Sequence, residues 1–210
     1  TRFRQKTVDW SGFASLDAKI SDRFTLTGSV RYTTEDRDAD YARDIIRNGN
    51  LIAAIYQPFA PVSLSRSQDY IDAAASAKFN ISDNAIIYAS YGKGSKTGGF
   101  ANAPNNPTIL RPDGTSTAEY DDEIAKTAEI GIKVGRASGT HVNVALFNVD
   151  VDNFQTSLFS GTSFIVKNID IRSRGVELEA MWRPMDELSF SLNGTYADAV
   201  NKQPAANERR

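Results

Sequence analysis

Few residues in this chain of 210 residues could carry out catalytic or metal chemistry. The chain has no cysteine and a single histidine, His141. A thiolate nucleophile, a thiolate metal site and a disulfide framework are therefore excluded. A Ser-His-Asp triad or a histidine-rich metal site would have to use His141. We interpret His141, which follows a tight turn, as an interfacial residue.

Acidic residues form two further candidate sites. Glu177 and Glu179 are two positions apart, so both side chains lie on one face of a strand. Paired carboxylates can perform acid–base chemistry, but we favour a charged, solvated wall whose partners are basic residues on neighbouring strands, such as Lys133. The run 121–123 reads Asp-Asp-Glu and could bind Ca²⁺. We favour an acidic base of a loop.

A glycine-rich run suggests a phosphate-binding loop, which needs a strand, the glycines and then a helix. Pro104 and Pro107 follow the run instead of a helix-forming segment. We therefore predict a flexible entry into a long loop. The glycines of the run are Gly92, Gly94, Gly98 and Gly99.

The elements that position these residues are β-strands, because apolar and polar residues alternate along the chain. In the segment 23–33, Phe24, Leu26, Val30 and Tyr32 lie on one face, and Thr, Ser and Arg residues lie on the other. The pattern recurs and predicts eight strands in four hairpins. The alternating segments are 6–20, 23–33, 68–81, 85–94, 124–134, 141–154, 174–182 and 187–199.

The predicted connections differ in length between the two ends of the strands. Tight turns are predicted at about 21–23, 82–84, 136–140 and 183–187, and a connection of medium length at 155–164. Two long connections, 38–66 and 98–122, are rich in Gly, Pro, Asn and Asp, which favour turns. Within 41–56 we predict at most a short helix. Short turns on one edge and long loops on the other are typical of outer-membrane barrels.

The apolar faces are predicted to contact lipid. The chain has no run of about 18 apolar residues, and its mean hydropathy of −0.39 is compatible with alternating barrel strands. The pattern persists for about 9–13 residues per strand, longer than the usual 5–6 of soluble strands and close to the 9–11 of a tilted membrane strand. Phe24 and Tyr32 bracket one apolar stripe, as aromatic residues do at membrane interfaces.

The net charge and the ends of the chain further limit the possible functions. A net charge of −2 and an isoelectric point of about 5.5 provide no basic surface for nucleic acid. The chain begins without methionine or a signal sequence and ends in a polar stretch. We therefore expect it to be an internal part of a longer protein.

Three segments resemble the barrel of TonB-dependent outer-membrane receptors. The first, 88–100 (YASYGKGSKTGGF), resembles a strand that ends in a glycine-rich run before an outer loop. The second, 123–159, resembles the family pattern of Glu, then Glu-hydrophobic-Gly-hydrophobic-Lys, a tight turn, and a strand ending in Phe and acidic residues before Gln. The third, 168–184, contains Asn and then Ser-Arg-Gly-Val-Glu-Leu-Glu. Their order and spacing also agree with the family.

The resemblance implies an all-β fold, an antiparallel up-and-down transmembrane barrel of about 22 strands with an N-terminal plug. Residues 1–210 would be part of that single barrel domain, with about eight long strands, short periplasmic turns and long outer loops. It implies a Gram-negative outer-membrane receptor, not an enzyme, that imports scarce solutes such as iron–siderophore complexes or cobalamin. The implied partners are outer-membrane lipid, the protein's own plug, the TonB complex and a small ligand such as a ferric siderophore; no cofactor is expected.

Candidate ligand contacts lie in the loops 38–66 and 98–122 and at their rim. A basic side chain there could attract an anionic ferric complex, although solvated rim charge is the commoner role. The candidates are Arg43, Arg47, Lys93 and Lys96.

Two other functions fit the alternation. A complete eight-stranded outer-membrane barrel could have a structural or adhesion role, but small lumen-facing Ser and Thr residues would fill its narrow interior poorly. A soluble secreted β-sandwich could act as a binding module, for example for carbohydrate.

Overall fold

The computed structural model describes residues 2–44, 58–102, 107, 109–135, 139–159 and 164–202, with the backbone alone at Phe164. These residues include no helix long and apolar enough to cross a membrane. The strands are β1 (Arg2–Lys19), β2 (Phe24–Arg43), β3 (Phe59–Ser82), β4 (Ala85–Lys96), β5 (Gly99–Phe100), β6 (Glu119–Tyr120), β7 (Glu123–Gly135), β8 (His141–Phe159), β9 (Phe164–Met185) and β10 (Leu188–Asn201).

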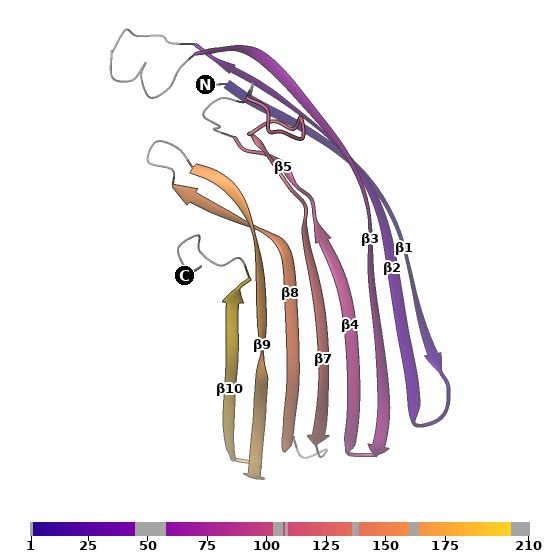
Figure 1. Ribbon diagram of the computed structural model, residues 1–210. Helices are drawn as coiled ribbons and strands as arrows, with labels where there is room; N and C mark the ends of the chain where they lie inside the picture. Colours follow the sequence, from indigo (N-terminus) through magenta and orange to yellow (C-terminus); the bar gives the residue numbers. More distant parts are fainter. Residues whose placement is uncertain are drawn as a thin grey trace.

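Eight of these strands form one curved antiparallel sheet (Figure 1) in the order β1-β2-β3-β4-β7-β8-β9-β10. Neighbours in the sheet follow one another along the chain, apart from β5 and β6, which form a separate short pair. The predicted up-and-down arrangement of eight long strands in four hairpins is confirmed. The β5–β6 segment lies on the concave side of the sheet (Figure 1).

The sheet topology excludes both alternative architectures. In a closed eight-stranded barrel β1 would pair with β10, whereas in the described residues β1 pairs with β2 and β10 pairs with β9. A sandwich would need two packed sheets of comparable size, and the second sheet here has only two short strands. The alternating pattern therefore belongs to one stretch of curved wall.

The apolar face of the wall is the convex one. Arg37 and Tyr41 of β2 bind the main chain of the β5–β6 segment, so the odd-numbered residues of β2 face the concave side. The even-numbered stripe from Phe24 to Tyr32 faces away, as predicted. Side chains of the same outward set are largely exposed, including Trp10 (75%) and Tyr196 (71%). This face has the alternating apolar character expected where a barrel meets lipid.

The long strands extend beyond the apolar band, which corrects the predicted bounds of the loop 38–66. β2 and β3 remain paired up to Arg43 and Phe59, so only 44–58 connects them. Polar side chains continue the outward face there: Ser63 donates to Asp40 and Ser67 donates to Asp36, each at 2.6 Å. The alternation of apolar residues ends at Tyr32, but main-chain pairing does not depend on it. Of the short helix predicted within 41–56, residues 41–43 are strand and 45–57 lie outside the described residues.

In the upper part of the wall β3 and β4 are no longer paired, and we call the line along which they separate the seam. Their pairing ends at Ala73 and Lys93, while β4 stays paired with β7 up to Lys96 and Glu123. The segment between β4 and β7 folds onto the concave face of β2 and β3 beside this seam (Figure 1). A small apolar core forms there from Ala39, Tyr41, Phe100 and Ala118. The described part of the predicted loop 98–122 thus packs against the wall through Phe100 and Ala118.

Two glycines on the concave face lie beneath aromatic rings from the adjacent strand. The Tyr88 ring covers Gly131, where an added Cβ would lie 2.7 Å from ring atoms. The Phe147 ring covers Gly175, where an added Cβ would lie 2.8 Å from the ring and 2.0 Å from the Tyr196 carbonyl oxygen. Aromatic cover of strand glycines is a known way to stabilise a curved sheet. These are the glycines of the Glu-Ile-Gly-Ile-Lys and Ser-Arg-Gly-Val-Glu segments.

Replacing Gly175 with alanine is expected to destabilise the barrel by about 1–3 kcal/mol, because the new methyl group would overlap the main chain of β10. Urea unfolding of the full-length protein in lipid vesicles measures this change. Gly194→Ala is the matched control, since an added Cβ there meets nothing within 4 Å. An equal effect of the two substitutions would contradict the packing role of Gly175.

Candidate functional site

Two arginines lie directly opposite each other on the concave face, at the upper end of β2 and β3. Arg37 and Arg66 are register partners, and their side chains are only 15% and 12% exposed. Like charges at directly opposed positions of a sheet repel each other. Both guanidinium groups therefore need carboxylates close by.

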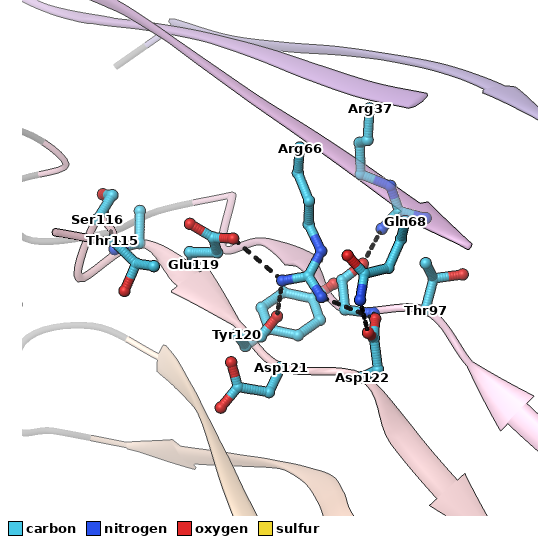
Figure 2. A network of polar contacts seen from close by, with 12 residues as sticks. Arg37, Arg66, Gln68, Thr97, Thr115, Ser116, Glu119, Tyr120, Asp121 and Asp122 are labelled. Atoms are coloured by element: carbon cyan, nitrogen blue, oxygen red, sulfur yellow. Dashed lines mark hydrogen bonds and ion pairs between the residues drawn. The ribbon is translucent and has the colours of Figure 1, made fainter. Parts of the chain in front are cut away.

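Carboxylates of β2 and of the β5–β6 segment neutralise these arginines. Figure 2 shows Arg66 beside Glu119 and Asp122. Arg37 pairs with Glu35 at 2.6 Å and donates to the carbonyl of Gly98 at 2.7 Å. Arg66 pairs with Glu119 at 3.0 Å and with Asp122 at 2.8 Å, and it also donates to the Tyr120 carbonyl at 3.3 Å. The β5–β6 segment is thus attached to the wall by charge-assisted hydrogen bonds, which are the stronger class.

Asp122 is the centre of this network. Its carboxylate accepts hydrogen bonds from Arg66, from the Gln68 amide at 2.6 Å and from the Gly98 main-chain N–H at 2.6 Å. On the Arg37 side of the network, Thr97 donates a hydrogen bond at 3.2 Å to Glu35, the ion-pair partner of Arg37. We refer to Glu35, Arg37, Arg66, Gln68, Glu119 and Asp122 as the rim clamp.

Gly98 and Gly99 allow the segment to approach the rim clamp. An added Cβ at Gly98 would lie 2.3 Å from the Tyr120 carbonyl oxygen, and one at Gly99 would lie 2.3 Å from a guanidinium nitrogen of Arg37. Both glycines are buried. The predicted flexible loop entry is therefore wrong at these two positions, because the glycines there serve close packing.

Tyr41 anchors the same segment above the clamp. Its side chain is 2% exposed and its hydroxyl donates to the Ala101 carbonyl at 2.6 Å. Burial, and secondarily the neighbouring Tyr120, raise the pKa of the Tyr41 hydroxyl above its ordinary value. The hydroxyl therefore remains a neutral donor throughout the physiological range.

A second polar cluster gathers residues from the family-like segments. The Gln155 main-chain N–H donates to Glu123 at 2.8 Å, and its side-chain amide donates to the carbonyls of Thr97 at 3.0 Å and Asp121 at 3.1 Å. Asn168 donates to the Asn153 carbonyl at 2.7 Å. Asn153 has a positive φ of 57° within a register shift of β8. This cluster ties the bulge of β8 and the start of β7 to the rim.

The acidic run 121–123 is used in these contacts. The Asp121 main chain bonds with Asn168, Asp122 belongs to the rim clamp, and Glu123 accepts from Gln155. Among the described residues no group of three or more His, Cys, Asp or Glu side chains could hold a metal ion. The acidic run fits the predicted base of a loop.

Lower on the concave face, three carboxylates are among the groups that line an open pocket of about 400 Å³. Tyr88 donates a hydrogen bond to Glu129, and Lys133 lies over the Tyr88 ring at 5.3 Å from its centroid. Glu177 and Glu179 also line the pocket. Their position on the concave face agrees with the predicted charged wall.

The polar partners of Glu179 lie on the neighbouring strand β8 and include a basic residue, as predicted, but it is His141 and not Lys133. The Glu179 carboxylate accepts from Asn143 at 2.8 Å and lies 3.7 Å from Nε2 of His141. Within the described part of the chain, Lys133 makes no ion pair with these glutamates within 4.0 Å, because it lies over an aromatic ring instead. The pocket therefore has a negative wall with one lysine at its side.

The four candidate ligand contacts lie in different environments. Arg43 is 5% exposed, with its guanidinium 4.9 Å from the centroid of the Phe59 ring. Arg47 lies outside the described residues. Lys93 is the register partner of outward-facing Ala73. Lys96 faces the concave side, 3.6 Å from Glu123, with 61% of its side chain exposed.

The comparisons with known proteins agree with this architecture. The family described as "TonB dependent receptor-like, beta-barrel" has a sequence model that matches residues 1–209. This chain belongs to that family. Comparison with curated protein sequences gives no significant match.

Solved structures of uptake, import and siderophore receptors share the fold of this chain. The ferric yersiniabactin uptake receptor FyuA from Yersinia pestis matches with a TM-score of 0.75 and 20% identity, over 95% of this chain and 28% of FyuA. The closed form of the ferric-catecholate import receptor Fiu from E. coli K12 gives 0.70 and 18%, over 96% of this chain and 29% of Fiu. The siderophore receptor PiuA from Acinetobacter baumannii gives 0.67 and 18%, over 94% and 26%. The chain thus spans about a quarter of these receptors.

The rim clamp itself was not predicted from the sequence. Arg66 falls within a segment assigned to a loop, and Arg37 lies just before it. The pairing of these arginines depends on a β2–β3 register that continues beyond the apolar alternation. A signal was present in the acidic and basic residues of 35–38, but nothing in the sequence placed 119–122 beside them.

Proposed function

We propose that this chain forms part of the wall of an outer-membrane receptor of Gram-negative bacteria that imports scarce solutes with energy from the TonB complex. Iron–siderophore complexes are the substrate class that we favour, and cobalamin is the second. The names of FyuA, Fiu and PiuA, which refer to ferric or siderophore uptake, support this choice.

One observation carries the proposal: the family match covers residues 1–209 of a wall that is apolar outside and polar inside. The role of such a wall is to enclose an aqueous path through lipid, and transport uses differential binding rather than covalent chemistry. The described residues of the segment 97–122 narrow the upper part of this path, since the rim clamp holds them on the concave face.

Within this function Lys96 is the best placed of the four candidate contacts. It is exposed on the concave side at the rim, where an anionic ferric complex would enter. Arg43 is buried, and the outward direction of Lys93 points away from the path.

The plug is the partner that we propose for the lower part of the concave face. Glu129, Glu177 and Glu179 give this surface a negative charge, with Lys133 alongside them. Basic side chains of a plug domain would complement such a wall.

Deletion of the full-length gene is expected to abolish growth on one ferric siderophore, or uptake of cobalamin, under limiting supply. Removal of TonB function should give the same loss, because the transport is energised from the inner membrane. Radiolabelled uptake across a panel of ferric siderophores and cobalamin measures both effects. Uptake that survives without TonB would contradict the proposal.

A further inference from the structure

The upper edge of β3 is unpaired along the seam, although the strand itself is regular. β3 continues from Asp72 up to Phe59, while its pairing with β4 ends at Ala73. On its other side β3 stays paired with β2 without a break as far as Val62. An unpaired strand edge is a template for another extended chain, unless features such as proline or lysine block it.

The hydrogen-bond pattern shows which main-chain groups of β3 face the seam. The Asn80 N–H donates to the Arg23 carbonyl at 2.8 Å, on the β2 side. Hydrogen-bonded pairs of an antiparallel ladder recur at every second residue, so the even-numbered residues of β3 bond to β2 and the odd-numbered ones face β4. Five odd-numbered residues above the last β3–β4 pair have no main-chain partner on that side among the described residues. They are Ser63, Ser65, Ser67, Asp69 and Ile71, all of them exposed and none of them proline or lysine.

A pocket of about 380 Å³ lies at the base of the seam. Its lining includes Asp69 of β3 and both Lys93 and Ser95 of β4. The main chain of Ser95 faces β3, because the hydrogen bond from Gly135 to the Asn84 carbonyl assigns the even-numbered residues of β4 to β7. The pocket therefore lies between two strand edges whose free donors and acceptors face each other.

Buried polar side-chain atoms on both sides of this base lack partners. Oγ of Ser95 and Oδ1 of Asp72 are shielded from solvent and have no hydrogen-bond partner among the described residues. Asp72 is the first residue of β3 above the last pair, and Ser95 lies two positions beyond Lys93 on β4. A buried polar atom without a partner is costly, so both atoms favour a ligand that supplies hydrogen bonds.

The spacing of the free groups indicates the chemistry of that ligand. From Ser63 to Ile71 they recur at every second residue, about 7 Å apart, over about 27 Å. The main chain of an extended peptide repeats its own donors and acceptors at the same interval. Its outward side chains would lie opposite serines and Asp69, so small residues and one basic residue fit best. Asp69 makes no ion pair within 4.0 Å in the described part of the chain.

We propose that the seam binds an extended peptide segment of a polypeptide outside the cell, which adds to the free edge of β3 as an antiparallel strand. The β5–β6 segment covers the concave side of β3 (Figure 1), so the peptide approaches from the outer side. The proposal takes from the proposed function only the side of the membrane on which the seam lies. Binding of the peptide does not require the imported solute.

A fluorescein-labelled heptapeptide, Lys-Val-Thr-Val-Thr-Val-Thr with both ends blocked, tests the site on the full-length protein in a non-ionic detergent. In antiparallel register its lysine lies opposite Asp69, and its threonines lie opposite Ser67, Ser65 and Ser63. Fluorescence anisotropy is expected to show saturable binding. N-methylation of the three threonines removes the N–H groups that face β3 and should weaken binding at least about tenfold. N-methylation of the three valines, whose N–H groups face away, is the matched control and should change binding by less than about threefold.

Substitutions at Ser67 test the same contact from the side of the protein. Ser67→Pro removes one N–H that faces the seam and leaves the bonds to β2 intact, as edge strands tolerate. It should weaken binding of the unmodified heptapeptide at least about tenfold, whereas Ser67→Ala keeps the N–H and should stay within about threefold.

Equal binding of the two N-methylated peptides, unchanged binding in Ser67→Pro, or an equal loss in Ser67→Ala would overturn the proposal. The peptide comparison needs no substitution, so it decides the question even where the proline variant does not fold. No transported solute enters the measurement, so a failure of the transport function would leave these outcomes unaffected.

Discussion

Arginine in place of Val30 or Leu192 is expected to destabilise the barrel by about 2–4 kcal/mol in a bilayer. Both positions lie near the middle of an apolar stripe on the convex face, with Ala73 and Ala180 as their register partners. A guanidinium group there would have to leave water for hydrocarbon. The free energy of unfolding of the full-length receptor in lipid vesicles, measured by urea titration, gives the effect.

Arginine at Thr27 or Ser191 is the control, because these residues lie on the same two strands but face the lumen. Thr27 donates to Asp17 at 2.5 Å on that face, so a nearby carboxylate is available to an introduced arginine. The expected change is below about 1 kcal/mol, as for other exposed substitutions. Similar losses on the two faces would show that the convex face does not contact lipid.

The wall could be predicted from the sequence because one physical rule applies along its whole length. Wherever one face meets lipid and the other meets water, side chains must alternate with a period of two, and the stripe from Phe24 to Tyr32 records this directly. The same reasoning placed Glu177 and Glu179 on a charged wall. Tight turns could also be predicted from the local sequence, since the Ser21 and Ser82 hydroxyls accept hydrogen bonds from main-chain N–H groups two or three residues later.

The upper part of the wall could not be predicted in the same way. Outside the lipid both faces of a strand are polar, so the alternation that identifies β2 stops at Tyr32 although the strand continues to Arg43. The inward fold of the segment 97–122 depends on contacts far apart in sequence, such as Arg66 with Glu119. No local pattern encodes such a pair, and its register follows only from the extended β2–β3 pairing.

The roles of several glycines also could not be predicted from the local sequence. The sequence marked Gly98 and Gly99 as breakers of regular structure, which is their usual meaning. Their actual role is to let two stretches of main chain and two arginines approach closely. Gly131 and Gly175 lie within strands and were not marked as breakers. A side chain at either position would nevertheless clash with an aromatic ring of the adjacent strand. A glycine's function depends on what lies next to it in space.

Replacing Arg66 with methionine is expected to release the segment 97–122 from the wall. The substitution removes ion pairs with Glu119 and Asp122 and leaves both carboxylates in an environment where they are only 16% and 20% exposed. Breaking a buried ion pair from one side costs about 3–5 kcal/mol. The free energy of local opening should therefore fall by about 3 kcal/mol, which corresponds to an increase of about 100-fold in amide hydrogen exchange.

Hydrogen–deuterium exchange of the full-length receptor, followed over the amides of 109–122, measures this release. Lys96→Met is the matched control: it also removes one basic residue at the rim, but from a pair with Glu123 in which the lysine is 61% exposed. Exposed pairs contribute about 0–1 kcal/mol, so exchange should rise by less than about fivefold. Glu119→Gln removes one of the two ion pairs of Arg66 and should give an intermediate increase. Unchanged exchange in the Arg66 variant would mean that the apolar contacts of Tyr41 and Phe100 hold the segment without the rim clamp.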